Sequence, residues 1–103
     1  MSEVCYLIDP EEMLKACEAG DVDKVRELLS RDSTLVNARG AYRQTPLHSA
    51  AGKGHTNVVE LLIRHGADLS ARDQFNFTAL DTALKAGHAK LAELLRARGV
   101  IAG

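Results

Sequence analysis

The stretch TPLHSAAGKGHTNVVELLIRHGAD, residues 45–68, carries the signals of two short helices joined by a tight turn. Thr45 is a favourable N-cap, and Pro46 suits the first helical position because its missing N–H would have no partner there. Apolar residues then recur three and four positions apart, which is the spacing of one helical face. We expect Gly52 and Gly54 to break this first helix, with Gly54 in a left-handed cap.

The second expected helix carries Val58, Val59, Leu61, Leu62 and Ile63. Its apolar arc is too wide for a surface helix. One pair of helices cannot cover that arc, so the pair must stack on neighbours on both sides. Gly66 ends this helix, and residues 67–74 have turn character and lead onward. The core residues that we expect to hold the stack are Leu47, Ala50, Ala51, Val59, Leu61, Leu62, Leu80, Leu94 and Leu95.

The chain repeats itself with a period of 33 residues. A shift of 33 residues places Thr45 on Thr78 and Gly66 on Gly99, among a longer ordered set of matches. A fainter copy precedes them at an offset of 34 residues and contains Gly20. Periods of this length indicate a solenoid in which every copy is one helix–turn–helix unit.

These residues resemble the ankyrin repeat, whose pattern runs from Thr-Pro-Leu-His through Gly-His to a Val-Val-x-Leu-Leu helix and Gly-Ala-Asp. Residues 45–68 match one full repeat, TALDTALKAGHAKLAELLRARG at 78–99 is a looser match, and MLKACEAGDVDKVRELL at 13–29 resembles a shortened first repeat. The resemblance implies an all-α solenoid of helix–turn–helix units with short β-hairpin turns. It also implies a non-catalytic role in protein–protein recognition.

The repeats predict one ankyrin-repeat domain over residues 9–103, preceded by an N-terminal tail over residues 1–8. The three repeats are expected at about 9–39, 40–72 and 73–103. Asp9 is expected to cap the first helix in a capping box with Glu12. The apolar segment Val4–Ile8 is expected to cover the open side of the first repeat, with docking on a partner or on a second copy as the alternative.

The tips of the two expected hairpins depart from the ankyrin pattern. The glycine that often lies two residues before the Thr is replaced by Arg43 in one hairpin and by Asn76 in the other. Asn tolerates the left-handed backbone region, whereas Arg does so less readily. We therefore expect the first hairpin to be distorted.

The size and composition of the chain limit the classes of function that it can have. The chain has 103 residues and a formal net charge of −1, which argues against general attraction to nucleic acid or to an anionic membrane. The start of the sequence lacks the features of a signal peptide, and the two cysteines fit a reducing compartment. We expect a soluble, monomeric protein of the cytoplasm or nucleus, without nucleic-acid or membrane partners.

Several residues of the central stretch look like catalytic or ligand-binding groups. His48 and Ser49 are neighbours on a helix, so their side chains point about 100° apart and cannot form a nucleophile–base pair.

Residues 51–55 lack the spacing of a phosphate-binding loop. His55 and His88 occupy equivalent turns, but no Cys or carboxylate stands at ligand spacing to complete a metal site. We expect no catalytic, cofactor or metal site, and we expect Thr45 and His48 to hydrogen-bond neighbouring backbone. Lys53 and Ser49 remain candidates for a recognition face.

Tyr42 and Phe75 occupy the same repeat position, at the expected hairpin tips, in a chain with only 4% aromatic residues. Aromatic residues are enriched at interface hot spots, although these two side chains could instead stack on each other or cover the hairpins. Basic residues beside them suggest a basic stripe, and the alternative is ordinary solvated charge. The expected partner is a protein or peptide with acidic residues and apolar anchors. The expected contact residues are Arg39, Ala41, Tyr42, Gln44, Lys53, Arg72, Gln74, Phe75, Phe77 and Lys85.

Two other functions remain open at this point. One is a purely architectural role, as a scaffold or as a fragment of a longer repeat array. The other is an enzyme that uses His48 and Ser49, which would require both side chains to converge on one pocket.

Overall fold

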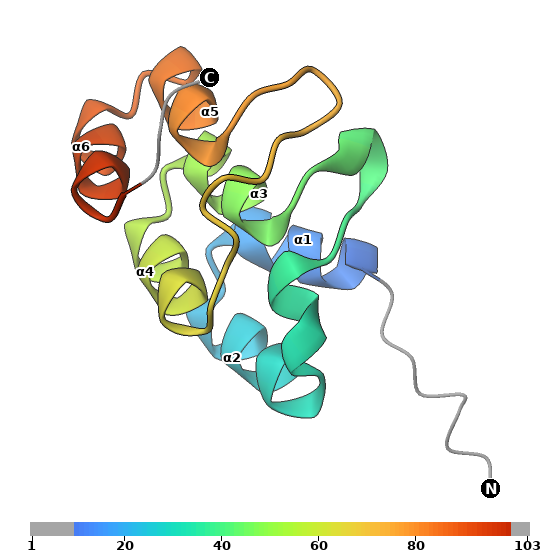
Figure 1. Ribbon diagram of the computed structural model, residues 1–103. Coiled ribbons are helices and arrows are strands. Elements are labelled where there is room, and N and C mark those ends of the chain that lie inside the picture. The colour runs from blue at the N-terminus through green and yellow to red at the C-terminus, as the bar shows by residue number, and fades with distance from the viewer. Residues whose placement is uncertain (1–9, 100–103) are drawn as a thin grey trace, which may run out of the picture.

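The computed structural model describes residues 10–99, which form three pairs of antiparallel helices in two rows (Figure 1). The inner row contains α1, α3 and α5, and the outer row contains α2, α4 and α6. The helices are α1 (Pro10–Ala19), α2 (Val22–Arg31), α3 (Pro46–Lys53), α4 (Thr56–Arg64), α5 (Ala79–Lys85) and α6 (Ala89–Ala97). The predicted all-α solenoid is therefore present in this part of the chain.

The connections that precede α3 and α5 contain no β-strand within residues 10–99, so the predicted β-hairpin turns are not found there. The first connection contains two short 3-10 helices, η2 (Ser33–Asn37) and η3 (Ala41–Arg43). Both connections still project as loops on the side of the inner helices (Figure 1). The tail at residues 1–8 and the Asp9 cap lie outside the described residues.

Helix α3 continues through Gly52 to Lys53, so the expectation that Gly52 breaks the helix is wrong. Gly54 ends the helix in the left-handed conformation, with φ 75°, as the sequence predicts. Gly52 has a packing role instead, because a Cβ at this position would lie 3.2 Å from Cγ2 of Thr82 on α5. The missing side chain lets the two inner helices approach closely.

The core is aliphatic and runs the length of the stack. Of the nine core positions predicted from the sequence, all are buried except Leu94, which is partly buried. Small residues separate the inner helices, whereas Val58, Val59 and Leu62 fill the space beneath them. This division explains why α1, α3 and α5 make the closest contacts between repeats. Cys17 belongs to the same core, and burial raises the pKa of its thiol to about 12.

Histidines at the turns between helices connect neighbouring repeats. The imidazole of His55 packs against Gly20, where a Cβ would lie 2.7 Å from Nδ1, and His88 packs against Gly54 in the same way. His55 Nε2 also donates a hydrogen bond to the carbonyl of Glu18, over 2.8 Å. These contacts explain why glycine occupies both turns.

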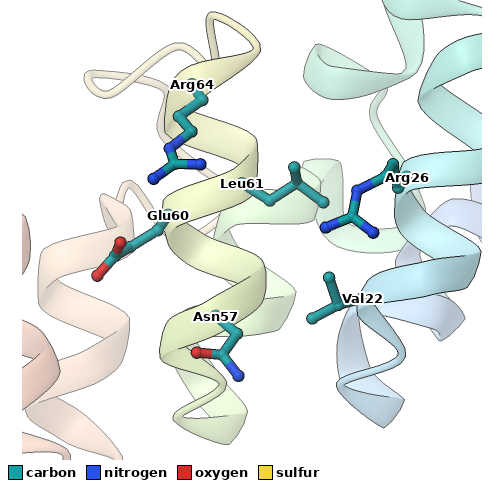
Figure 2. A pocket seen from close by; sticks show the side chains of 6 residues that line it. All are labelled: Val22, Arg26, Asn57, Glu60, Leu61 and Arg64. Carbon is teal, nitrogen blue, oxygen red and sulfur yellow. The ribbon is translucent and has the colours of Figure 1, made fainter.

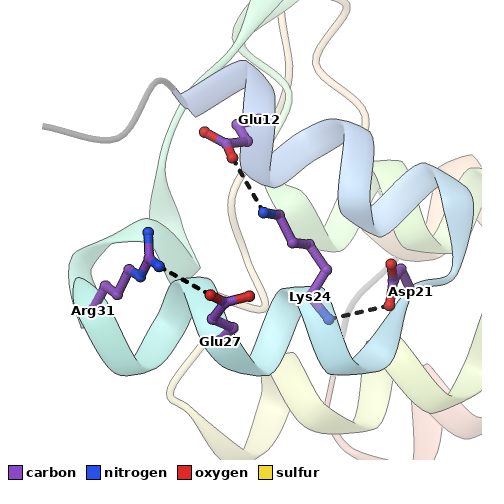
Figure 3. Close-up of polar contacts among 5 residues, drawn as sticks. All are labelled: Glu12, Asp21, Lys24, Glu27 and Arg31. Atoms are coloured by element: carbon purple, nitrogen blue, oxygen red, sulfur yellow. Dashed lines mark hydrogen bonds and ion pairs between the residues drawn. The ribbon is translucent and has the colours of Figure 1, made fainter. Parts of the chain in front are cut away.

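The first repeat carries polar contacts along its outer surface (Figure 3). Asp21 caps α2 by accepting a hydrogen bond from the Lys24 N–H, over 3.1 Å. The Lys24 ammonium lies 3.4 Å from a carboxylate oxygen of Glu12, which joins α2 to α1. Further along α2, Glu27 pairs with Arg31 over 3.0 Å.

Candidate functional site

Two loops, which we call finger 1 (residues 39–44) and finger 2 (residues 72–77), have nearly the same internal hydrogen bonds. In finger 1 the Gly40 N–H donates to the Gln44 carbonyl over 2.9 Å, and in finger 2 the Asp73 N–H donates to the Phe77 carbonyl over 3.0 Å. A second backbone bond closes each tip, at 3.1 Å in finger 1 and 2.9 Å in finger 2. The 33-residue period is therefore preserved in the loops as well as in the helices.

The finger tips differ in backbone conformation. Tyr42 and Arg43 both have positive φ in finger 1, at 60° and 58°, whereas finger 2 has positive φ only at Asn76, at 69°. In finger 2 the Asp73 carboxylate accepts the Phe75 N–H over 2.9 Å, a local bond that favours an ordinary turn. Finger 1 has Gly40 at that position and no side chain to make this bond. The predicted distortion of the first loop is confirmed, because two consecutive residues of finger 1 have positive φ.

Tyr42 and Phe75 lie together at the finger tips. Their ring centroids are 6.0 Å apart, with an interplanar angle of 27°. The Gln74 N–H donates to the Tyr42 carbonyl over 2.7 Å and joins the two fingers. The rings nevertheless remain 60% and 58% exposed, so stacking does not bury them. A preformed apolar surface therefore stands at the tips.

A groove opens beside this surface, between the fingers and the ends of α3 and α5, with a cavity volume of about 390 Å³. Its lining residues are Gln44, Gly52, Asp73, Phe75, Phe77, Thr82, Lys85 and Ala86. The ammonium of Lys85 lies 4.5 Å from the centroid of the Phe77 ring, within the range of a cation–π contact. A cation and aromatic surface thus share one groove, which we call the concave groove.

The structure brings together four of the predicted contact residues in this groove, namely Gln44, Phe75, Phe77 and Lys85. Tyr42 lies next to them through its ring contact with Phe75. The backbone of Gln74 and of Ala41 belongs to the fingers, whereas Lys53 is exposed at the end of α3 and does not line the groove. The predicted contact residues therefore fall into a groove set and a peripheral set.

The two finger arginines have a structural use. Arg39 Nη1 donates to the carbonyls of Arg43 and Arg72, over 2.7 Å in each case. Arg72 Nη1 donates to the Asn76 carbonyl over 3.1 Å. Arg39 thereby ties finger 1 to finger 2. Both side chains remain exposed, but their hydrogen bonds to backbone show that they organise the fingers as well as carrying charge.

Thr45 and His48 connect the start of α3 to finger 2. They form a capping box, and His48 Nδ1 lies 2.8 Å from Thr45 Oγ1. His48 Nε2 donates to the Phe77 carbonyl over 2.7 Å, which fixes the tautomer because a carbonyl only accepts. Burial lowers the pKa of His48 and keeps the ring neutral, although the bond to Phe77 and nearby carboxylates oppose this shift. The predicted bonding of both residues to neighbouring backbone is confirmed.

Ser49 is buried, and its Oγ has no hydrogen-bond partner among the described residues. His48 and Ser49 therefore do not converge on a pocket, and Ser49 is not available to a partner as part of a recognition face. Within residues 10–99, no three His, Cys, Asp or Glu side chains are placed to hold a metal ion. The Gly-Lys-Gly segment is the end of a helix, and the fold offers it no strand to follow as in a phosphate loop.

Sequence reasoning missed Gly52, Asp73, Thr82 and Ala86 as parts of the groove wall. The role of Asp73 could have been predicted from the sequence, since an Asp at the start of a turn commonly accepts a hydrogen bond from the backbone N–H two residues further on. Its carboxylate accepts from both Phe75 and Phe77, over 2.9 and 3.0 Å. Thr82 and Ala86 had no such signal, because their place depends on how closely α5 approaches α3.

Residues 13–101 match the family model of ankyrin repeats, in three copies. The chain therefore belongs to the ankyrin-repeat family, whose members are generally protein-interaction modules and are typically not catalytic. No curated protein matches the chain significantly. Within residues 10–99, no helix is both long and apolar enough to cross a membrane.

Proposed function

We propose that this chain binds a protein or peptide segment through the concave groove and the adjoining Tyr42–Phe75 surface. The observation that supports this proposal is the exposed aromatic pair beside a groove that contains a lysine. Large aromatic side chains supply much of the binding energy at interfaces when a partner buries them. Here they are already held in place, which lowers the ordering cost of binding.

The chemistry of the groove indicates the partner. Lys85 offers a positive charge at the groove wall, and Phe77 beneath it offers an apolar surface. An acidic side chain next to an apolar anchor matches this combination, with the acidic group near Lys85 and the apolar group against Phe75 and Phe77. We propose such a segment as the ligand, with the chain acting as a monomer in the cytoplasm or nucleus.

The test is affinity capture from cell lysate with mass spectrometry, comparing the full chain with the double variant Tyr42→Ala, Phe75→Ala. We expect the variant to remain folded by circular dichroism and to lose the partners that the unchanged chain retains. The control is Leu84→Ala, which removes a 44% exposed apolar side chain that does not line the groove. The control should retain every partner.

Capture of the same partners by the double variant and by the unchanged chain would contradict this proposal. That result would favour the architectural alternative, in which the repeats connect other parts without a groove ligand. A second variant, Lys85→Gln, tests the charge preference separately. It should weaken capture most for partners whose binding segments are acidic.

A further inference from the structure

A second groove lies on the opposite row of helices, between α2 and α4, with a cavity volume of about 340 Å³ (Figure 2). Its lining residues are Val22, Arg26, Asn57, Glu60, Leu61 and Arg64. Figure 2 shows Arg26 and Leu61 extending toward each other across the space between the helices, with Val22 below them. Glu60 and Arg64 extend from the other side of α4. We call this feature the outer groove.

The outer groove exists because the two rows of helices pack differently. Glycine and alanine let the inner helices approach closely, whereas α2 and α4 make fewer contacts with each other. Val22 is only partly buried at the start of α2, and Leu61 forms the facing wall. The floor of the outer groove is therefore the edge of the core, where the partly exposed Val22 and the 9% exposed Leu61 meet the space between the helices.

Arg26 places a positive charge over this floor. Its ion pair is with Asp23, at 3.3 Å, and the two side chains are 61% and 95% exposed. Ion pairs this exposed contribute little stability, because water screens both charges. The guanidinium can therefore exchange Asp23 for a carboxylate on a partner, with which it can form two parallel hydrogen bonds.

Asn57 completes the chemistry at the start of α4. Its side-chain amide carries both a donor and an acceptor, the same pair of groups that a peptide backbone presents. In Figure 2 this amide lies on α4 at the lower end of the groove, across from Val22 on α2. An amide at one end, an apolar floor and a guanidinium above it together match a short peptide that carries an acidic residue.

We propose that the outer groove is a second docking surface, which binds an acidic peptide segment with an apolar residue next to its carboxylate. The carboxylate pairs with Arg26, the apolar side chain lies on Val22 and Leu61, and Asn57 bonds to the peptide backbone. Charge complementarity supports an acidic peptide, because two of the three charged residues that line the groove, Arg26 and Arg64, are positive. This surface is separate from the concave groove and does not depend on the function proposed there.

The experiment is an NMR titration of the full, ¹⁵N-labelled chain with the blocked pentapeptide Ala-Leu-Asp-Leu-Ala, at up to about 10 mM, a range suited to weak binding. We expect saturable shifts of the Asn57 side-chain amide and of the Arg26 and Leu61 backbone amides. The same peptide with Asn in place of Asp should bind about tenfold more weakly, because it loses a charge-assisted pair.

Two arginines on α2 provide a matched comparison. Arg26 and Arg31 are 61% and 62% exposed, and each pairs with a carboxylate on its own helix, but only Arg26 lines the outer groove. Figure 3 shows the Arg31–Glu27 pair. Arg26→Gln should weaken binding about tenfold and make the Asp and Asn peptides equivalent. Arg31→Gln should leave binding unchanged.

Three outcomes would overturn this proposal. They are no shift at Asn57 over the whole titration, equal weakening by both arginine substitutions, and shifts confined to Phe77 and Lys85. The last outcome would assign the acidic peptide to the concave groove and so support the first proposal alone. Shifts confined to Asn57 and its neighbours would support the outer groove even if the concave groove binds nothing.

Discussion

Finger 1 and finger 2 present an aromatic side chain at the same repeat position, but different contacts attach them to the preceding repeat. In finger 1, Gly40 lies against Leu14 of α1 so closely that a Cβ would overlap the Leu14 Cδ1 methyl. Finger 2 has Asp73 at the position of Gly40, and its Phe77 carbonyl accepts the hydrogen bond from His48. The contacts with the preceding inner helix therefore differ, since Leu14 packs against finger 1 whereas His48 hydrogen-bonds to finger 2.

This difference begins at a single repeat position. Leu14 in the first repeat and His48 in the second occupy equivalent places, and each contacts the finger that follows it. In the third repeat the position is Asp81, whose carboxylate accepts the Thr78 N–H over 3.1 Å within its own capping box. The same repeat position thus makes three different contacts: Leu14 packs against a finger, His48 hydrogen-bonds to a finger, and Asp81 bonds within its own helix cap.

The largest expected effect concerns the attachment of finger 1. Leu14→Ala should lower the free energy of unfolding by about 2–5 kcal/mol, because Leu14 is buried and its removal leaves a cavity. Gly40→Ala should cost about 1–3 kcal/mol through overpacking. Urea denaturation followed by circular dichroism measures both changes.

The double variant Leu14→Ala, Gly40→Ala tests whether these two effects share one contact. It should be more stable than the sum of the two costs implies, since the new Cβ enters the space that Leu14 vacates. Strict additivity of the two changes would show that the contact between Gly40 and Leu14 does not hold finger 1.

A smaller effect is expected at the attachment of finger 2. His48→Gln should lower the free energy of unfolding by about 1–3 kcal/mol, because it leaves the Phe77 carbonyl without its hydrogen bond. Glutamine at this helix position preserves a capping box, so the loss reports the inter-repeat bond. The measurement is again urea denaturation at pH 7.5.

Asp81→Gln provides the matched control, because it makes the same replacement in the equivalent cap of α5. We expect a smaller loss there than at His48. Equal losses at both positions would mean that the His48–Phe77 bond adds nothing beyond the cap. Amide exchange at the Asp73 N–H, compared with the Gly40 N–H, would localise the effect to finger 2.

The smallest expected effect is a pH dependence of finger 2. Burial lowers the pKa of His48 in the folded state below 6.5, so the unfolded chain takes up this proton first as the pH falls. Stability is therefore complete above pH 6.5 and declines below it, by at most about 1.4 kcal/mol at pH 5.5. The measurement compares urea denaturation at pH 7.5 and 5.5 in the unchanged chain and in His48→Gln.

The variant should lose less stability than the unchanged chain over this pH interval. An identical decline in both proteins would assign the pH dependence to other groups.

Much of the framework was accessible from the sequence because it depends on local signals. Thr45 and Pro46 start a helix wherever they precede an apolar helical pattern, and Gly54 ends it through its left-handed conformation. The 33-residue period then predicts the same unit again. The period also placed Tyr42 and Phe75 at equivalent repeat positions, and the resemblance to ankyrin repeats implied that these positions are loop tips.

The errors concern residues whose role depends on distance across repeats. Gly52 was expected to break α3, but it continues the helix and lets α5 approach. Ser49 is a candidate recognition residue from the sequence, but its side chain is buried in the structure. No signal within one repeat distinguishes a glycine that ends a helix from one that accommodates a neighbour.

The sequence by itself determined the repeat length, the start of α3, its left-handed cap at Gly54, the aliphatic core and the equivalent repeat positions of the two aromatic residues, since these follow from local signals and from the period. The tertiary structure alone decided that Arg39 ties the fingers together, that Phe77 lies beneath Lys85, and that a groove opens between α2 and α4. The physical reason is that these features join residues from different repeats. Their distances are set by how closely whole helices pack, and packing is a property of the stack.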